Sequence, residues 1–100
     1  MKLIASFLFF TLSISMCVSQ TPIIDSLINL LKTDKQDTTK LIHLYTICDE
    51  YQTIGNNYEG LYYGNQTLAF ADELDTHLKS EKQKKTIQKY KALTYNDIAG

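Results

Sequence analysis

The stretch GNNYEGLYYGNQTLAFA, residues 55–71, decides how this chain folds. It contains three of the four glycines of the chain, yet apolar side chains recur around two of them with the spacing of a helix. A glycine inside a helix costs roughly 0.5 to 1 kcal/mol relative to alanine. Because Gly60 and Gly64 are four residues apart, they lie on the same side of that helix. We therefore expect the preceding helix to approach closely at both positions; the alternative is a frayed segment.

The helix that contains this stretch is predicted to cover about residues 57–79. Gly55 ends the helix before it, because glycine adopts the left-handed backbone of a helix C-terminus without steric cost. Asn56 stands three residues before Glu59, a spacing typical of a capping box. These residues predict a tight turn between two helices. The apolar stripe of the second helix is predicted to consist of Leu61, Gly64, Leu68, Ala71, Leu74 and Leu78.

Three further helices are predicted from caps and periodicity. Thr21 and Pro22 are a typical helix start, and the stripe that follows is Ile23, Ile24, Leu27, Leu30 and Leu31. A second helix over about residues 38–54 carries the stripe Leu41, Leu44, Ile47, Cys48 and Tyr51. The last begins near Ser80 with capping-box spacing, and its stripe is Ile87, Tyr90, Thr94 and Ile98. The pattern predicts an all-α fold of antiparallel helical hairpins.

The N-terminal residues have the layout of a secretory signal peptide. Lys2 precedes the apolar run LIASFLFFTLSI, which is shorter than the roughly 20 residues that a membrane-spanning helix needs. Cleavage after Ser19 is predicted, because Cys17 and Ser19 are small residues at the two specificity positions. Lipidation at Cys17 is an alternative, although Met16 before it departs from the usual small residue. We expect an exported chain, periplasmic or in the cell envelope, that meets the membrane only through this segment or a downstream span.

Charge and cysteine content exclude several classes of function. The chain has 10 basic residues, all lysine, against 11 acidic ones, and its net charge is −1. Such a balance gives no strong attraction to nucleic acid or to anionic lipid. Only Cys48 remains after the predicted cleavage, so no internal disulfide is expected.

The spacing of residues in the two middle helices resembles the tetratricopeptide repeat. Leu44, Ile47, Cys48 and Tyr51 match the first helix of that repeat, and Gly60, Gly64, Thr67 and Asp72 follow without a gap at the positions of its second helix. Gly64 replaces a large aromatic residue and Asp72 replaces the usual proline. The residues expected to pack the helices together are Leu44, Ile47, Cys48, Tyr51, Gly60, Gly64 and Thr67.

The resemblance divides the chain into four parts. These are a signal peptide at 1–19, a leading helix and linker at 20–37, a first helix pair at 38–79, and the first helix of a second repeat at 80–100. Tyr95, Ile98 and Ala99 repeat the order of residues 44, 47 and 48 in that last part. Since no polar run closes it, we expect the natural protein to continue beyond Gly100. The implied fold is a fragment of a right-handed solenoid.

The chain as a whole is similar to the start of bacterial exported tetratricopeptide proteins, in which the repeats often precede a sensor histidine kinase or a DNA-binding regulator. The resemblance implies a protein- or peptide-interaction module that senses or scaffolds within a larger signal-transduction protein. The alternative is a freestanding secreted helical adaptor in cell-envelope assembly. The residues themselves show no output domain.

No pattern of catalytic or metal-binding residues is evident. His43 and His77 lie on different predicted helices, without cysteines or carboxylates at the spacing of a zinc site. Cys48 is five residues from His43, on a different side of the same helix, and a small buried residue accounts for it better than a nucleophile does. We expect no enzyme activity, no metal and no cofactor.

Tyrosine, of which the chain has seven, suits recognition surfaces because it offers contact area and a hydroxyl at low entropy cost. Tyr45, Asp49 and Gln52 recur at i, i+4 and i+7, beside the packing stripe of their helix. The resemblance places this arc on the concave side of the array, with Asn96 as its counterpart in the next repeat. We expect these four residues to contact a protein or peptide partner; the alternative is an ordinary polar surface.

Overall fold

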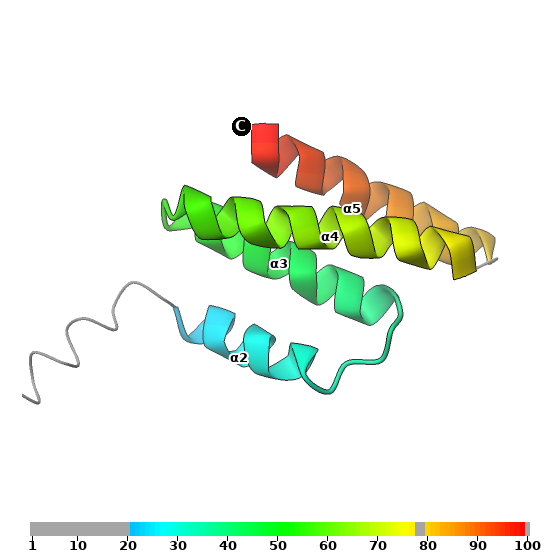
Figure 1. Cartoon of the computed structure of the whole chain (residues 1–100), viewed down its shortest axis with the longest axis horizontal. Coiled ribbons are helices and arrows are strands. Elements are labelled where there is room, and N and C mark those ends of the chain that lie inside the picture. Colours follow the sequence, from blue (N-terminus) through cyan, green and yellow to red (C-terminus); the bar gives the residue numbers. More distant parts are fainter. Residues whose placement is uncertain (1–20, 78–79, 100) are drawn as a thin grey trace, which may run out of the picture.

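The computed structural model describes residues 21–77 and 80–99, and these form helices joined by short turns. The helices are α2 (Pro22–Leu31), α3 (Thr38–Thr53), α4 (Asn57–His77) and α5 (Glu81–Ala99), and the described residues contain no strand (Figure 1). The predicted all-α fold is therefore confirmed. The predicted signal peptide at 1–19 and the stripe residue Leu78 lie outside the described residues.

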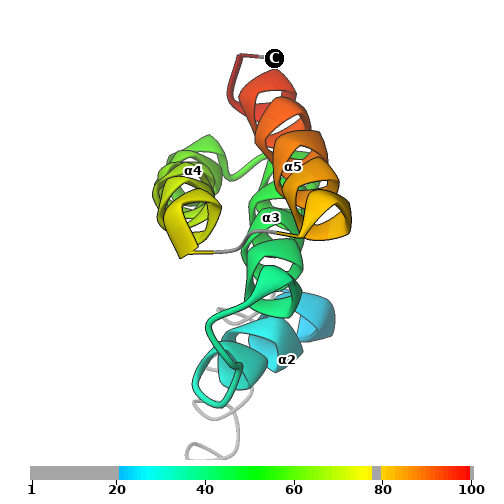
Figure 2. The same ribbon diagram turned by 90° about the vertical axis from the view of Figure 1, so that its right-hand side faces the viewer.

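The helices are arranged around α3. Consecutive helices run antiparallel to one another, and α3 contacts α2, α4 and α5, whereas α2 has helix contacts with α3 alone among the described helices (Figure 1). Viewed along the helices, α4 and α5 lie side by side on one side of α3, and α2 lies on the other (Figure 2). This placement leaves α2 and α4 separated, with α3 between them.

Side-chain caps explain where the helices begin. The Thr21 hydroxyl accepts a hydrogen bond from the backbone N–H of Ile24 at 3.2 Å. Asp37 accepts from the N–H of Thr39 at 2.9 Å, and the Asn56 side chain accepts from the N–H of Glu59 at 3.3 Å. Each cap satisfies a backbone donor that the first turn of a helix leaves without a partner. The turn between α3 and α4 depends on Gly55, whose φ is +83°.

The core consists of two clusters that share α3. One joins α3 to α4 and α5 and contains Leu41, Leu44, Phe70, Ala71, Leu74 and Ile87. The other joins α3 to α2 and contains Ile24, Ile47 and Tyr51. Since α3 supplies residues to both, its one apolar stripe packs against α2 as well as against α4 and α5.

The two helical glycines lie at close helix contacts. A Cβ added at Gly60 would stand 2.8 Å from the Gln52 side chain of α3, and one at Gly64 would stand 3.2 Å from Cys48 Sγ and 2.8 Å from Ile98 of α5. Gly64 thus allows the following helix, as well as the preceding one, to approach α4.

The buried face of α4 contains Gly64, Ala71 and Leu74 of the predicted stripe, but Gly60 and Thr67 take the places of Leu61 and Leu68. Leu61 was expected in the stripe but is 45% exposed. Steps of four and three residues from Gly60 instead give Gly64, Thr67, Ala71 and Leu74, all of which are buried. Leu61 lies at the edge of this face because the close contact at Gly60 sets the rotation of the helix. The buried Thr67 hydroxyl is satisfied by donating to the Tyr63 carbonyl at 2.7 Å.

Candidate functional site

Tyr45, the first residue of the predicted partner-binding arc, contacts α5. Its ring lies 5.4 Å from the ring of Tyr90, centroid to centroid, with the planes tilted by 58°. Burial, together with the charges of Asp49 and Asp97, raises the pKa of the Tyr45 hydroxyl to about 12. The half-buried ring is therefore part of the contact between α3 and α5.

Asp49, the second residue of the arc, faces a carboxyl group of α5. The Asp97 side chain lies near Asp49 and the Tyr45 hydroxyl, which both act on its titration. Its Oδ2 atom is buried and has no hydrogen-bond partner among the described residues. Burial first, and then the hydrogen bond and charge of Asp49, raise the pKa of Asp97 to about 6. We call Tyr45, Asp49 and Asp97 the acid seam.

The other two residues of the arc have different surroundings. The Gln52 side chain lies against Gly60, where it fills the space that a side chain of α4 would otherwise occupy. Asn96 is exposed on an open face of α5 that also carries Tyr95 and Ala99. The structure thus brings Tyr45 and Asp49 together in the acid seam and gives Gln52 a contact with α4. A role of these four residues in partner binding remains a prediction.

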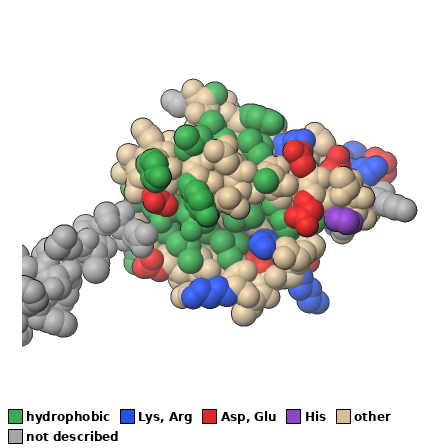
Figure 3. Space-filling model, viewed as in Figure 1, with side chains coloured by type: hydrophobic (Ala, Val, Ile, Leu, Met, Phe, Trp, Pro, Cys, Tyr) green, Lys and Arg blue, Asp and Glu red, His purple; other side chains and the backbone are tan. Residues whose placement is uncertain are grey.

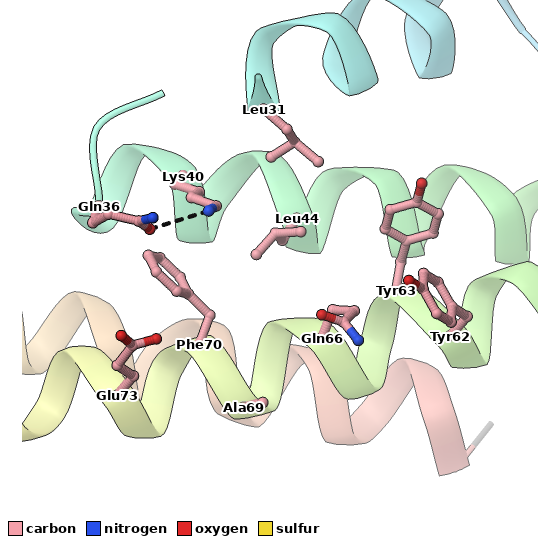
Figure 4. A pocket seen from close by; sticks show the side chains of 10 residues that line it. All are labelled: Leu31, Gln36, Lys40, Leu44, Tyr62, Tyr63, Gln66, Ala69, Phe70 and Glu73. Carbon is pink, nitrogen blue, oxygen red and sulfur yellow. Dashed lines mark hydrogen bonds between the residues drawn. The ribbon is translucent and has the colours of Figure 1, made fainter. Parts of the chain in front are cut away.

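A groove on another face is a second candidate for binding. It lies between the C-terminal end of α2, the first half of α3 and the middle of α4, and it has a volume of about 470 Å³. Figure 3 shows hydrophobic side chains gathered on this face, in the hollow between α4 and α2. We call it the aromatic groove, and the residues that line it are Leu31, Gln36, Lys40, Leu44, Tyr62, Tyr63, Gln66, Ala69, Phe70 and Glu73 (Figure 4).

The separation of α2 from α4 produces the groove. Leu44 of α3 lies in the middle, with Leu31 of α2 on one side and Phe70 of α4 on the other (Figure 4). Tyr63 stacks on the buried Tyr51 at 5.7 Å, and Tyr62 meets the edge of Tyr63 at 5.2 Å. These contacts hold the rings in place, while Tyr62 remains 54% exposed. The groove therefore offers a preformed aromatic surface to solvent.

Lys40 places a positive charge at one end of the groove. Its ammonium group donates a hydrogen bond to the Gln36 side chain at 3.0 Å and lies 5.0 Å from the centre of the Phe70 ring. Within residues 21–77 and 80–99 the ion pairs are Asp34 with His43 and Asp72 with Lys91, so Lys40 has none. Its ammonium group still has donors that a ligand could use.

The histidine and cysteine of α3 occupy separate surroundings. Nδ1 of His43 lies 2.6 Å from Asp34 Oδ2, which ties the loop before α3 to that helix. Cys48 is completely buried, and burial, with the charges of Asp97 and Asp49, raises its pKa to about 11. A thiol with so high a pKa is a poor nucleophile at neutral pH. In the described parts of the chain, no group of three or more His, Cys, Asp or Glu residues could hold a metal ion.

Comparison of the chain with family models, curated proteins and solved structures finds no match. The likeness to tetratricopeptide repeats thus stays a prediction from the sequence. None of the described helices is both long enough and apolar enough to cross a membrane.

Sequence reasoning did not find the aromatic groove. Tyr62, Tyr63 and Phe70 recur at helical spacing in the stretch 55–71, which also contains the two helical glycines. Their pattern on one helix does not show that α2 leaves them uncovered.

Proposed function

We propose that this chain is a protein-interaction module that binds a short apolar segment of a partner protein in the aromatic groove. The observation that carries the proposal is the groove itself, a hollow lined by Tyr62, Tyr63 and Phe70 that no described part of the chain fills. Exposed apolar patches with a polar rim are typical of protein-binding surfaces. Tyrosine is among the residues enriched at the energetic centres of such surfaces.

The chemistry of the groove favours a segment that combines apolar anchors with a carboxylate. The volume of about 470 Å³ lies within the range of about 300–1,000 Å³ that is usual for ligand pockets. It therefore accepts a few side chains rather than a whole domain. Lys40 has no ion pair among the described residues and is partly removed from solvent. A carboxylate beside it would form a charge-assisted hydrogen bond, which is stronger than a neutral one.

The wider context of the module is proposed from the sequence. Three consecutive antiparallel helices around one shared core support a tetratricopeptide-type solenoid, in which such hairpins stack. The apolar N-terminal run supports export, and the chain would then be the sensing or scaffolding segment of a larger bacterial signalling protein. A freestanding secreted adaptor is the second candidate. The gene sequence beyond Gly100 discriminates between them, since a membrane span after further repeats favours the sensor.

A displayed library of random peptides, selected against the immobilised protein, tests the groove. We expect enriched sequences with two large apolar residues near an Asp or Glu. Tyr62→Ala and Lys40→Gln should each weaken binding of a selected peptide by about tenfold, which is on the order of 1 kcal/mol. Tyr58→Ala is the matched control, because Tyr58 is on the same helix, is 82% exposed and lies outside the groove. Equal losses for Tyr58→Ala and Tyr62→Ala would contradict the proposal.

A further inference from the structure

The acid seam places two carboxyl groups against each other where the last helix packs on α3. Asp97 of α5 faces Asp49, Tyr45 and Cys48 of α3, and Tyr90 of α5 lies beside Tyr45. The groups whose charges act on this seam are carboxyl, hydroxyl and thiol groups, and no lysine or histidine is among them. Next to the seam, α4 contributes Gly64, which has no charged side chain and lies against Ile98 of α5. Lys89 lies 5.5 Å from the centre of the Tyr90 ring, but among the described residues no cation acts on the carboxyl pair itself.

Two ionised carboxylates cannot form a hydrogen bond with each other, because both only accept. In the described structure Asp97 Oδ2 is buried without a partner, which is costly for a polar atom. A proton shared between Asp97 and Asp49 would let the two carboxyl groups form a hydrogen bond and would remove one of the two like charges. The Tyr45 hydroxyl acts in the opposite direction, since it lowers the pKa of Asp97, but burial and Asp49 outweigh it. The geometry thus favours a protonated pair.

We propose that the docking of the C-terminal end of α5 onto α3 is controlled by a proton shared between Asp49 and Asp97. With the proton present, the pair joins the two helices. Once it is lost, the two carboxylates repel each other, and the end of α5 separates more often from α3.

The direction of the pH dependence follows from the raised pKa of Asp97. The folded chain binds this proton more tightly than the unfolded chain, whose aspartate titrates near its ordinary value of about 3.9. The stabilising contribution is therefore complete below about pH 4 and is lost as the pH rises to about 6 and above. Docking of α5 weakens toward neutral pH.

Cys48 offers a local reporter of this opening. Ile98, which follows Asp97 in α5, lies against Gly64 of α4. The Cys48 sulfur of α3 lies against the same glycine. Because Cys48 is completely buried in the docked state, movement of the end of α5 would expose its sulfur. The chain has only one other cysteine, Cys17, so a Cys17→Ser chain has a single thiol to follow.

The experiment measures the rate at which a neutral disulfide reagent labels Cys48 in the Cys17→Ser chain between about pH 5 and pH 7.5. Each rate is divided by the rate for the same chain in denaturant at the same pH, which removes the ordinary increase of thiolate with pH. We expect protection of Cys48 to fall by on the order of tenfold across this range, since one pKa unit corresponds to a factor of ten.

Two variants and a control decide the cause. Asp97→Asn, whose amide can donate to Asp49 at every pH, should keep protection nearly constant, and Asp49→Asn should do the same from the other side. Asp72→Asn is the matched control: it removes an exposed carboxylate that pairs with Lys91 of α5 at 2.9 Å, away from the seam, and should retain the pH dependence. Each variant is compared with the parent chain at every pH.

The inference is overturned if protection is equal at pH 5 and pH 7.5 in the parent chain, or if Asp97→Asn and Asp49→Asn lose protection as the parent does. Should one variant fail to give the helical circular dichroism of the parent, the other provides the comparison. The result is independent of the proposed function, because no peptide is present.

Discussion

Gly64 of α4 lies so close to Ile98 of α5 that an added Cβ would stand 2.8 Å from its Cδ1 atom and 2.9 Å from its Cγ1 atom. Real Cβ atoms essentially never approach other atoms below 3.0 Å, so a side chain at this position would force the Ile98 side chain, or the helix that carries it, to shift. The same Cβ would stand 3.2 Å from the Cys48 sulfur of α3. A single glycine thus allows three helices to meet.

Gly64→Ala should destabilise the protein. The strain of an overpacked site costs about 1–3 kcal/mol, whereas the better helix propensity of alanine returns up to about 1 kcal/mol. We expect a net loss of about 1 kcal/mol in the free energy of unfolding, measured by urea denaturation. An unchanged or higher stability would show that α5 moves away from α4 without cost.

Gly60→Ala is the matched comparison and should behave differently. The added Cβ would meet only the Gln52 side chain, whose amide can rotate away. With little strain to oppose it, the gain in helix propensity should leave stability unchanged or raise it by about 0.5 kcal/mol. A loss as large as that of Gly64→Ala would mean that Gln52 is held rigidly over Gly60.

Asp34→Ala should loosen the loop between α2 and α3. The Asp34 carboxylate lies 2.6 Å from His43 Nδ1, and its side chain is 9% exposed. Losing such a charge-assisted hydrogen bond costs about 1.5–3 kcal/mol. Thermal denaturation measures the loss, with Asp75→Ala as the control, because Asp75 is exposed on α4. Equal effects of the two changes would show that the contact with His43 contributes nothing.

The protein should lose stability at alkaline pH. Burial, together with the charges of Asp97 and Asp49, raises the pKa of Cys48 from 9.0 to about 11. The unfolded chain therefore releases this proton first, and the stabilising contribution is lost as the pH rises from about 9 to about 11. Tyr45 acts in the same direction at slightly higher pH. Denaturant titrations at several pH values should show a smaller alkaline loss for Cys48→Ala than for the parent, and identical losses would refute this origin.

The helices were predictable because their boundaries are encoded locally. Thr21, Asp37 and Asn56 cap the helices that follow them, and Gly55 has the positive φ that its place after a helix predicts. The rotation of α4 was harder to predict, since Gly60 and Leu61 both lie at a helical spacing from Gly64. Only the contact with α3 shows which of the two faces inward.

The two candidate sites depend on contacts between helices, which a pattern on one helix does not contain. Tyr45 and Asp49 looked like an open arc because nothing in α3 shows that Tyr90 and Asp97 face them. The aromatic groove likewise requires that α2 and α4 stand apart on α3. The two helices stand apart because α2 packs on one side of α3, whereas α4 packs on another side together with α5.

Amide NMR chemical shifts of the protein, recorded while a peptide selected from the library is added, test the central claim most directly. If the groove is the binding site, the largest changes should fall on residues that line it, such as Lys40, Leu44, Tyr62 and Phe70, and Lys40→Gln should weaken the response. Changes confined to Tyr45, Asp49 and Asn96 would contradict this account and assign binding to the arc beside α5.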